Sequence, residues 1–498
     1  MNLMNRYRLL VFTALLPGSL TVFSQEMWGT ALGNYAGTGG VRLNPSAMHH
    51  SKSYLDVQLL GLGFFLQNNY LYLLKEDYRF SNFFKGGYEW PSHQEDYGVE
   101  ERIFYRYPSR FHKNAFIQNR IDGPGAMLVW DRHAVALTTA LRSVSSMTHI
   151  PDDLANFIYL GLNYIPQQDI RYTDYGPIRA SAMSWGEIGL SYSYIVHARG
   201  FHRLAAGITL RRLLGLGGAY VHASYLQYVV PDDSTIDIRN LDATLGVALP
   251  LDYNDNTALT SPLFKGGGFG LDAGVTYTRL ARWHQEEYYG SLCARPYEDY
   301  HWRLGLAFID IGGIRFRNNA VKMRIDNRPS YWEDVNSLNI TSVGQLLDTI
   351  SYKFYGDNTS AYAGDRFTLW LPTALSMQFD YHLRPNIYLN ASLVQGIPMA
   401  RGAIVRPSEL TVTPRYESRW FEAGLPVSLY NWQLLRIGLE VRILGLTLGT
   451  EKLGGFFHMS DFTGLDFYAS LKFFLDRGSC RAKGPVHCGA DDENYRTR

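Results

Sequence analysis

In the stretch GLDAGVTYTR, residues 270–279, larger apolar residues alternate with small or polar residues. In an extended chain, successive side chains point to opposite faces, so this stretch has one apolar face and one small or polar face. The apolar face holds Leu271, Ala273, Val275 and Tyr277, and the other face holds Gly270, Asp272, Gly274, Thr276 and Thr278. This dyad pattern is typical of a wall strand in a transmembrane β-barrel, with its apolar face toward lipid.

The same pattern returns along most of the chain, for example in residues 302–308, 435–443 and 465–475. A soluble β-sandwich or propeller also alternates, but its strands average about five or six residues and its solvated faces are rich in Lys and Glu. Here the runs are longer, and their polar faces hold glycine and isolated charges. No linker interrupts residues 53–476, so the sequence predicts one all-β domain, a transmembrane antiparallel β-barrel of about 14 strands with an N-terminal hatch.

The predicted strands begin near residues 53, 124, 133, 184, 201, 217, 235, 268, 300, 366, 386, 411, 433 and 465. If the last strand ends in the periplasm, the turns on that side fall at residues 131–132, 199–200, 230–234, 282–299, 383–385 and 431–432. The outer loops then fall at residues 75–123, 146–183, 214–216, 251–267, 325–365, 399–410 and 451–464. The alternation of short turns with longer loops supports this orientation.

One of the long outer loops is expected to contain a helix. Helical spacing links Val343, Leu346, Leu347, Ile350 and Phe354. We expect this helix to pack on its own barrel at the mouth, and binding of a partner protein is the alternative.

The N-terminus has the features of an export signal. Arg6 and Arg8 precede an apolar run over residues 9–23, and cleavage after Ser24 fits the small residues there. A membrane anchor is the alternative, but the run is shorter than the ~20 residues that a span needs. The predicted organisation is therefore a signal peptide at 1–24, a hatch segment at 25–52, an outer-membrane barrel at 53–476 and a periplasmic tail at 477–498.

The charge balance and the cysteine content argue against some classes of function. The chain has 47 Lys+Arg and 46 Asp+Glu, and removing the two arginines of the signal leaves a net charge near −1. That balance does not favour nucleic-acid binding. The 3 cysteines form neither a disulfide framework nor a zinc site. A Cys480–Cys488 bridge is one reading of the tail, which leaves Cys293 unpaired.

Between the signal and the first strand, GGVRLNPSAM (39–48) is Gly-rich and almost uncharged. Glycine permits tight turns and close packing, and Asn44-Pro45-Ser46 favours a turn over a strand. Trp28, Tyr35, Leu43 and Met48 favour burial. We therefore expect residues 25–52 to fold back into the lumen as a hatch, and a disordered leader is the alternative.

The alternation also assigns charged side chains to the lumen. The predicted inward face includes six acids and six bases: Asp56, Glu187, Asp272, Asp380, Glu440, Asp466, Arg203, Arg211, Arg303, Arg436, Arg442 and Lys472. Opposite charges in a confined lumen tend to pair, because an unpaired buried charge carries a desolvation cost of several kcal/mol. The expected lumen charge network centres on Glu187, Asp272, Arg303, Arg436, Glu440 and Arg442. The alternative is that these charges stay hydrated.

The arrangement resembles the superfamily of long-chain fatty-acid transporters of the outer membrane. The resemblance implies fourteen strands and a hatch with an Asn-Pro-Ala type motif, matched by Asn44-Pro45-Ser46 with Ser46 in place of the usual Ala. Type IX secretion barrels of Bacteroidota share that plan. The chain is most similar to a Bacteroidota family of outer-membrane barrels with no assigned activity. The matching stretches are SWGEIGLSYSY (184–194), FIDIGGIRF (308–316) and ESRWFEAGLPVSLYNWQLLRIGLEVRILGLTLGTEKL (417–453).

These features predict a passive, non-enzymatic transporter of hydrophobic or small amphipathic solutes. Its expected partners are outer-membrane lipids and a hydrophobic small-molecule ligand. The alternative is a scaffold subunit that binds other envelope proteins. No cofactor is expected, because Asp252, Asn254 and Asn256 lack the Gly and Glu of a calcium loop, and His49-His50 lacks a metal-binding helical context. Asp131-Arg132-His133 lies in a predicted turn without a serine partner, so no catalytic site is expected.

Overall fold

The computed structural model describes residues 31–480, except 80, 83–84, 86–87, 96–98, 100, 108–110, 260, 285–290, 401 and 458. The predicted signal peptide, the first residues of the expected hatch segment and nearly all of the predicted tail lie outside the described residues. None of the described helices has both the length and the apolar character needed to cross a membrane.

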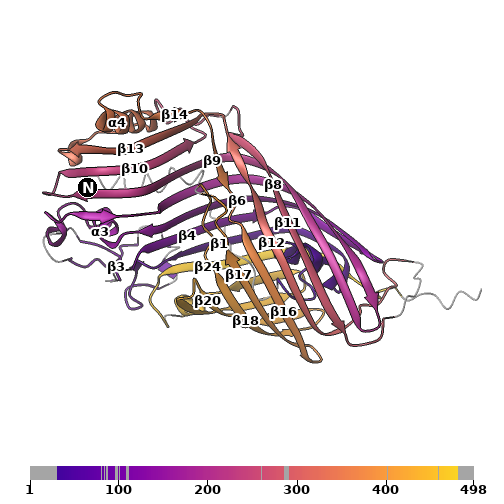
Figure 1. Ribbon diagram of the computed structural model, residues 1–498. Helices are drawn as coiled ribbons and strands as arrows, with labels where there is room; N and C mark the ends of the chain where they lie inside the picture. Colours follow the sequence, from indigo (N-terminus) through magenta and orange to yellow (C-terminus); the bar gives the residue numbers. More distant parts are fainter. Residues whose placement is uncertain are drawn as a thin grey trace, which may run out of the picture.

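Fourteen wall strands, counted over the described residues, form one closed antiparallel barrel (Figure 1). Four of the fourteen are split in two where the ladder is interrupted, and β24 pairs with β1 to close the wall. In order round the wall they are β1 (Ser53–Asn68), β4 and β5 (Lys113–Asp122, Gly125–Trp130), β6 (His133–Ile150), β8 (Ile178–Arg199), β9 (His202–Val229), β11 (Gly266–Leu280), β12 (Tyr300–Phe316), β15 and β16 (Phe367–Trp370, Ala374–Arg384), β17 (Ile387–Gly396), β18 (Glu409–Glu417), β19 and β20 (Phe421–Gly424, Val427–Tyr430), β21 and β22 (Leu434–Ile437, Leu439–Ile443), β23 (Leu446–Thr450) and β24 (Gly464–Asp476).

The two ends of the barrel differ. One end, the hairpin end, holds the start of β1, the end of β24, short turns at 131–132, 200–201, 385–386, 418–420 and 444–445, and the segment 281–299. The other, the loop end, holds the longer connections. There β10 (Ile236–Ala248) pairs with the far half of β9, and β13 (Ala320–Trp332) pairs with β10, so a sheet extends beyond the wall (Figure 1).

Short elements complete the two ends. At the loop end α4 (Val343–Tyr355) packs on β10 and β13, which is the helix expected from the sequence, although it lies on the sheet extension. The other short elements are α2 (Thr38–Val41), η1 (Pro45–His50), β2 (Leu71–Tyr72), β3 (Tyr105–Arg106), α3 (Asp152–Leu160), η3 (Ile165–Gln167), β7 (Tyr172–Asp174), η4 (Val335–Ser337), β14 (Tyr362–Gly364) and α5 (Leu453–Phe456).

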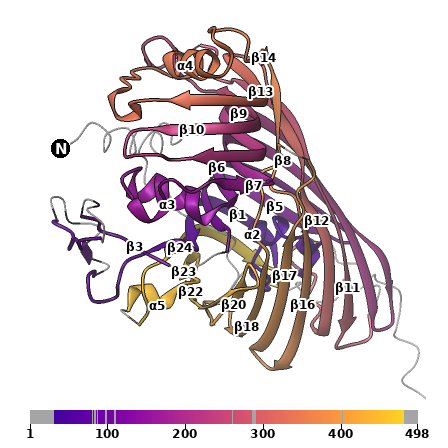
Figure 2. The ribbon, with the colours of Figure 1, turned by 60° about the vertical axis from the view of Figure 1, so that its left-hand side comes forward.

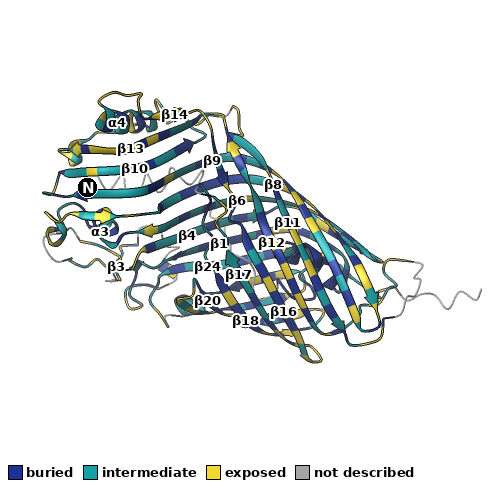
Figure 3. Ribbon diagram, in the orientation of Figure 1, coloured by how far each residue is buried: buried dark blue, intermediate teal, exposed yellow. Residues whose placement is uncertain are grey.

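Burial follows the predicted dyad pattern along the wall strands (Figure 3). In β11, Asp272, Thr276 and Thr278 are buried inside the barrel, whereas Ala273 and Val275 are exposed outside. Large apolar side chains are exposed round the outer surface. They include Leu137, Leu141, Ile188, Leu190, Ile208, Leu210, Val275, Leu304, Leu306, Phe308, Met377, Phe379, Leu389, Val412, Leu435, Ile437, Ile443, Leu446, Leu448, Leu471 and Phe473. We call this surface the apolar belt.

The predicted number of strands is confirmed. It is correct because two predicted strands that are not wall strands are balanced by two wall strands that were not predicted. The strands predicted from 217 and 235 are not separate wall strands, because β9 runs unbroken through the predicted loop 214–216 and β10 belongs to the sheet extension. Two wall strands were missed, 421–430 and 446–450. As a result, the connections at 230–234 and 431–432 lie at the loop end, opposite to their predicted side.

Local chemistry explains these errors. In β9 a Cβ on Gly218 would lie 2.8 Å from atoms of Phe316 and Leu369, so glycine admits packed side chains there within a strand. The missed strand 421–430 is broken at Pro426, which cannot donate to the ladder. The strand at 446–450 was missed because it has only five residues, although its side chains alternate between the two faces.

Candidate functional site

Residues 31–52, the N-terminal segment, lie inside the barrel at the hairpin half (Figure 2). Leu43, Met48 and His49 are fully buried, and Ala31, Leu32 and Leu43 pack against inward-facing residues of β12, β16, β17 and β24. Val41 and Met48 pack against Met127, Val129, Ala134 and Ala136 of β5 and β6. The segment therefore contacts both sides of the lumen at one level.

Asn44, Pro45 and Ser46 form a turn that is hydrogen-bonded to the wall. The Asn44 Oδ1 accepts from the Ser46 backbone N–H at 3.0 Å and from the Ser46 hydroxyl at 2.7 Å, which caps η1. The Asn44 Nδ2 donates to the Val275 carbonyl at 3.2 Å and to the Gln378 Oε1 at 3.0 Å. Proline suits the first position of a helical turn because no N–H is needed there.

Glycines in three neighbouring strands make room for this turn. A Cβ on Gly207 would lie 2.6 Å from the Pro45 carbonyl carbon, and one on Gly274 would lie 2.3 Å from the Asn44 Oδ1. A Cβ on Gly305 would lie 2.9 Å from the Asn44 Nδ2. Contacts this short do not occur between real side chains, so glycine in the wall and the Asn-Pro-Ser turn fit each other.

Polar contacts hold the rest of the N-terminal segment at several points round the wall. Asn34 donates to Glu417 of β18 through both its backbone N–H and its side-chain amide, at 2.9 and 3.0 Å. Thr38 donates to Asp56 of β1 at 2.9 and 3.1 Å. Further contacts are Arg303 to the Leu32 carbonyl, Arg42 to Asp122, Lys52 to Glu417 and Lys472 to the Tyr35 and Ala36 carbonyls.

Beside the segment, the charged lumen residues fall into three groups. The first is centred on Asp310 of β12, whose two oxygens accept from Arg142 at 2.8 and 3.0 Å and which also pairs with Arg211. Arg211 also binds Asp272, and Arg142 lies 3.4 Å from Glu187. The predicted residues Glu187 and Asp272 are both in this group.

The second group is centred on Arg415 of β18, which lies between Asp380, Glu417 and Glu422 at 3.4–3.5 Å. Two of the predicted lumen residues join it from either side. Arg303 pairs with Asp380 at 2.7 Å, and Arg442 pairs with Glu422 at 2.9 Å.

The third group lies nearer the loop end and is mainly acidic. Arg436 pairs with Glu409, and Glu440 accepts from the Tyr468 hydroxyl at 2.9 Å. Glu451 and Asp466 are fully buried in the same region. The six predicted network residues are thus all inside the barrel, but two belong to each group, and the structure does not join them into one network.

Several members of these groups were not predicted: Arg120, Asp122, Arg142, Asp310, Glu409, Arg415, Glu417 and Glu422. Asp310 was not predicted to face the lumen, because a bulge in β12 with a positive φ at that residue shifts the alternation. Glu422 lies in the missed strand 421–430. The sequence offers one signal for Asp310. Counting back in steps of two from the residues that follow the Gly-Gly pair at 312–313, such as Ile314, places Asp310 on the inward face.

An apolar layer fills the lumen toward the loop end. Its members include Phe65, Phe116, Trp185, Leu213, Phe316, Leu369 and Ile404, from strands on both sides of the barrel. Ile404 belongs to the connection 397–408, which enters the barrel: the Val405 N–H donates to the Ser146 hydroxyl at 3.2 Å, and the Ile404 N–H donates to the Trp370 carbonyl. Sequence reasoning placed this connection among the outer loops and missed its inward position.

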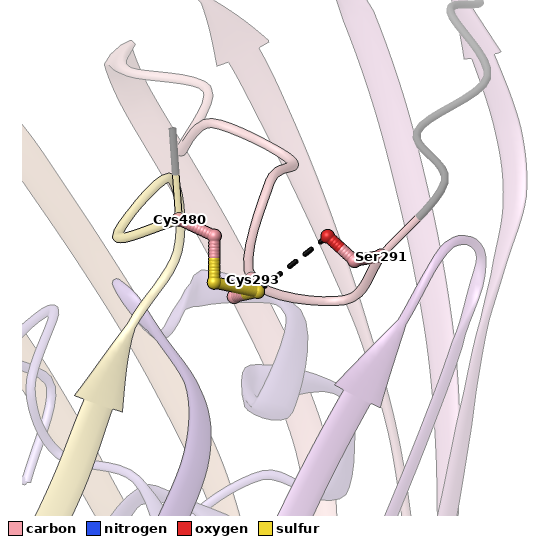
Figure 4. Close-up of a disulfide and its surroundings, with 3 residues drawn as sticks. All are labelled: Ser291, Cys293 and Cys480. Carbon is pink, nitrogen blue, oxygen red and sulfur yellow. Dashed lines mark hydrogen bonds between the residues drawn. A yellow bond between two sulfur atoms is a disulfide. The ribbon is translucent and has the colours of Figure 1, made fainter. Parts of the chain in front are cut away.

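Residues of segment 281–299 and the residues that follow β24 lie across the hairpin end. The Tyr297 hydroxyl of segment 281–299 donates to the Asn34 side chain at 3.1 Å, and the Arg477 N–H donates to the Lys52 carbonyl at 2.8 Å. Cys293 and Cys480 join these two pieces by a disulfide (Figure 4). The Cys480–Cys488 bridge that the sequence left open is therefore not formed, because Cys480 pairs with Cys293, which lies 187 positions away. Cys488 lies outside the described residues.

His49 and His50 of η1 are buried close to arginines. Loss of hydration lowers the pKa of both side chains well below the usual value, and the nearby Arg203 and Arg477 lower it further. Both histidines are therefore neutral at pH 7. Among the described residues, no group of three or more His, Cys, Asp or Glu is placed to hold a metal ion.

At the level of the N-terminal segment, the lumen is closed by noncovalent contacts, which can be broken. A cavity of about 20 Å³ between the N-terminal segment and the wall is lined by residues that include Thr276, Arg303 and Gln378, and it has room for about one water molecule. Most anchors of the segment are single hydrogen bonds and ion pairs, each of modest net stability. The segment therefore fills this level of the lumen through noncovalent contacts, many of them polar, and is joined to the barrel by the chain at Ser53.

No curated protein matches the chain. Among solved structures it is similar to a FadL homologue of Pseudomonas aeruginosa, with 10% identity and a TM-score of 0.40, over 92% of this chain and 99% of that one. It is also similar to the Ralstonia pickettii toluene transporter TbuX, with 8% identity and a TM-score of 0.38, over 88% and 94% of the two chains.

A family comparison covers most of the barrel. The match runs from the Asn-Pro-Ser turn to the connection after β23, so it includes the wall strands that surround the N-terminal segment. Over residues 45–451 the chain matches DUF5723, a family of unknown function, and it belongs to that family.

Proposed function

We propose that this protein is a passive, non-enzymatic outer-membrane transporter of hydrophobic or small amphipathic solutes, with the N-terminal segment as its hatch. The apolar belt supports a place in a membrane, because leaving so many large apolar side chains in water is unfavourable. Aromatic side chains near the hairpin end, such as Trp130, Trp302 and Trp420, are placed like the girdle of a membrane interface. We assign the hairpin end to the periplasm. The Bacteroidota affiliation stays a prediction.

The observation that carries the proposal is the way in which the lumen is filled. The N-terminal segment is held by polar contacts at the hairpin half, and the apolar layer lies beyond it toward the loop end. A solute that enters from the loop end would meet Trp185, Leu213 and Leu369 once the connection 397–408 moves. Apolar side chains in a lumen select for apolar solutes, since a water-filled pore gains nothing from them.

Uptake into proteoliposomes tests the solute class, with toluene and a fluorescent long-chain fatty acid as probes. We expect faster entry than into empty liposomes for at least one of them, and slower entry in Ile404→Asn. A matched control is Phe457→Asn, since Phe457 is exposed in a loop-end connection. Entry at the rate of empty liposomes for both probes would overturn the assigned solute class.

Removal of residues 31–50 tests the hatch. We expect single-channel conductance in a planar bilayer to rise severalfold, because the described part of the plug at the hairpin half is gone. Unchanged conductance in a folded barrel would overturn the hatch assignment.

The sheet extension favours one second candidate, a scaffold for envelope proteins. It carries α4 beyond the wall and exposes Tyr331 and Tyr352. A gentle-detergent pull-down from the native membrane separates the two functions. A stoichiometric protein partner supports the scaffold, and a lone barrel carrying an apolar ligand supports the transporter.

A further inference from the structure

A cavity of about 430 Å³, open to solvent, lies beside α4 at the loop end. We call it the α4 cavity. Its lining comes from three parts of the chain: Asn254 in the connection after β10, one face of α4, and Asn358 in the turn after α4. The volume is in the range of ligand pockets, about 300–1,000 Å³. Because α4 lies on the sheet extension, the cavity is separate from the N-terminal segment and from the apolar layer (Figure 1).

Helical spacing gives α4 two different faces. Its apolar face, which includes Leu347 and Ile350, packs against β10 and β13. Side chains three or four positions apart share a face of a helix. The opposite face of α4 lines the cavity with Gln345, Asp348, Thr349 and Tyr352. The Tyr352 ring is 58% exposed, so a flat aromatic surface is presented to whatever enters the cavity.

The wall of the cavity that contains Asn254 is fixed to the start of α4. The Gly344 N–H donates to the Tyr253 carbonyl at 2.7 Å, and the Asn256 Nδ2 donates to the Thr341 carbonyl at 2.7 Å. A Cβ on Gly344 would lie 2.7 Å from the Tyr253 carbonyl oxygen, so glycine permits this close approach. The connection after β10 is therefore held in place beside the helix.

The wall that contains Asn358 is also held by hydrogen bonds. The Asp357 carboxylate accepts from the Ser360 backbone N–H at 2.7 Å, which fixes the turn round Asn358. The Tyr362 hydroxyl donates to the Asp348 Oδ1 at 3.0 Å and orients that carboxylate. The cavity is thus formed before any ligand binds, which reduces the entropy cost of binding.

The chemistry of the lining favours a neutral sugar. The carboxamides of Asn254 and Asn358 both donate and accept hydrogen bonds, as sugar hydroxyls do, and the planar Asp348 carboxylate can accept from two neighbouring hydroxyls. The Tyr352 ring suits the C–H face of a sugar ring. Among the described residues that line the cavity, none is Lys or Arg, so the lining does not favour a phosphate or another anion.

We propose that the α4 cavity binds the end of a neutral oligosaccharide. The Tyr352 ring packs against one sugar unit, and Asn254, Asp348 and Asn358 bind its hydroxyls. The hairpin end is assigned to the periplasm, so the cavity faces the outside of the cell. The sugar comes either from the polysaccharide of lipopolysaccharide in the same membrane or from a free oligosaccharide, and the recognition chemistry is the same for both.

A glycan array tests the ligand class. The full barrel, in a detergent without a sugar headgroup, is applied to neutral, amino and acidic oligosaccharides. We expect retention on neutral glycans, and at least about tenfold weaker retention of Tyr352→Ala and Asn358→Ala. The matched control is Tyr331→Ala, which removes a tyrosine of similar exposure, 52%, outside the cavity lining and should change nothing. Absence of retention on neutral glycans, or equal retention of the parent and Tyr352→Ala, overturns the proposal.

Calorimetric titration with the best retained glycan tests the role of the ring. We expect Tyr352→Phe to keep the Kd within about threefold of the parent value, since the ring remains, and Tyr352→Ala to raise it at least about tenfold. Equal losses for the two variants would overturn packing of the ring on the sugar.

Competition then identifies the source of the glycan. Displacement by the detached polysaccharide of the native lipopolysaccharide assigns that source, and binding that it does not displace assigns a free oligosaccharide. Capture of an envelope protein that is lost in Tyr352→Ala, with no glycan retained, overturns the sugar site in favour of the scaffold. Uptake of the apolar probes should be unchanged in Tyr352→Ala, which separates a failure of this inference from a failure of the proposed function.

Discussion

The two walls of the lumen use similar residues in different ways. On the wall from β4 to β12, the carboxylates of Asp310, Asp272 and Glu187 meet arginines, and the hydroxyls of Ser191 and Thr209 meet each other. On the wall from β17 to β24, the amide of Asn390 and the hydroxyls of Ser392, Thr411 and Thr413 are buried and have no hydrogen-bond partner. At these positions the first wall is stabilised by contacts between its own side chains, and the second wall lacks such contacts.

The largest expected effect comes from breaking the first wall at its centre. Asp310→Asn removes a carboxylate that Arg142 and Arg211 share, so that of the carboxylates in this group only Glu187 remains beside Arg142 and only Asp272 beside Arg211. Loss of one partner from a buried charge group costs about 3–5 kcal/mol. We expect a drop of that order in the unfolding free energy, measured by denaturant titration in detergent.

The matched control is Asp326→Asn, because Asp326 pairs with Arg324 at a site where both side chains are more than half exposed. Exposed pairs contribute about 0–1 kcal/mol. Equal losses for the two variants would contradict the central position of Asp310.

The second effect is a pH dependence at His49 and His50. Burial lowers the pKa of both in the folded state, so below about pH 6.5 the unfolded chain binds protons that the folded chain does not. Stability is therefore full above pH 6.5 and falls as the pH drops, by up to about 1.4 kcal/mol per unit for each histidine. Denaturant titrations at pH 7.5 and 5.5 measure this loss.

The double variant His49→Gln/His50→Gln serves as its control. It should be less stable at pH 7.5 but should lose less stability on acidification than the parent does. A parent barrel whose stability is unchanged between pH 7.5 and 5.5 would exclude the proposed neutral state of the two histidines.

A third, smaller effect is expected where the first wall touches the Asn-Pro-Ser turn. Gly274→Ala places a Cβ 2.3 Å from the Asn44 Oδ1, so the turn must shift. Overpacking of this kind costs about 1–3 kcal/mol. We expect a lower melting temperature and more frequent channel openings in a planar bilayer.

Gly267→Ala in the same strand is the control, since its Cβ meets nothing closer than 3.4 Å. If the two alanine variants have the same melting temperature and the same frequency of channel openings, the close fit between β11 and the turn does not contribute to stability.

The smallest effect compares the two hydroxyl pairs directly. Thr209→Val leaves the buried Ser191 hydroxyl without a partner, which costs about 1 kcal/mol or more. Thr411→Val breaks no hydrogen bond within the protein and should cost less. Chemical denaturation of both variants measures the difference. A larger loss for Thr411→Val would show that its hydroxyl has an essential partner in the folded barrel.

The sequence was a good guide wherever side chains alternate strictly. Period-two alternation assigns each residue to the lumen or to the outside, and it placed Glu187, Asp272, Arg303, Arg436, Glu440 and Arg442 inside. It failed where the backbone departs from regular strand geometry. The bulge at Asp310 and the break at Pro426 both shift or interrupt the alternation, and the residues after them were assigned wrongly or left out.

Contacts between distant parts of the chain lay beyond the sequence. Cys293 and Cys480 meet because segment 281–299 folds under the end of β24, and no local spacing encodes that meeting. The insertion of Ile404 into the lumen depends in the same way on the strands that surround it. Asn44-Pro45-Ser46 was predictable as a turn, but its fit against Gly207, Gly274 and Gly305 required the barrel to be assembled.

The most direct test of the central claim locks the N-terminal segment to the wall. Ser46→Cys and Thr276→Cys replace two hydroxyls that lie 2.7 Å apart, in a background with all three native cysteines changed to serine. If the segment is a hatch, apolar probe uptake by proteoliposomes should stop when the new disulfide forms and return on reduction, while the cysteine-free parent should not respond to either treatment. Undiminished uptake with the lock closed would contradict the hatch.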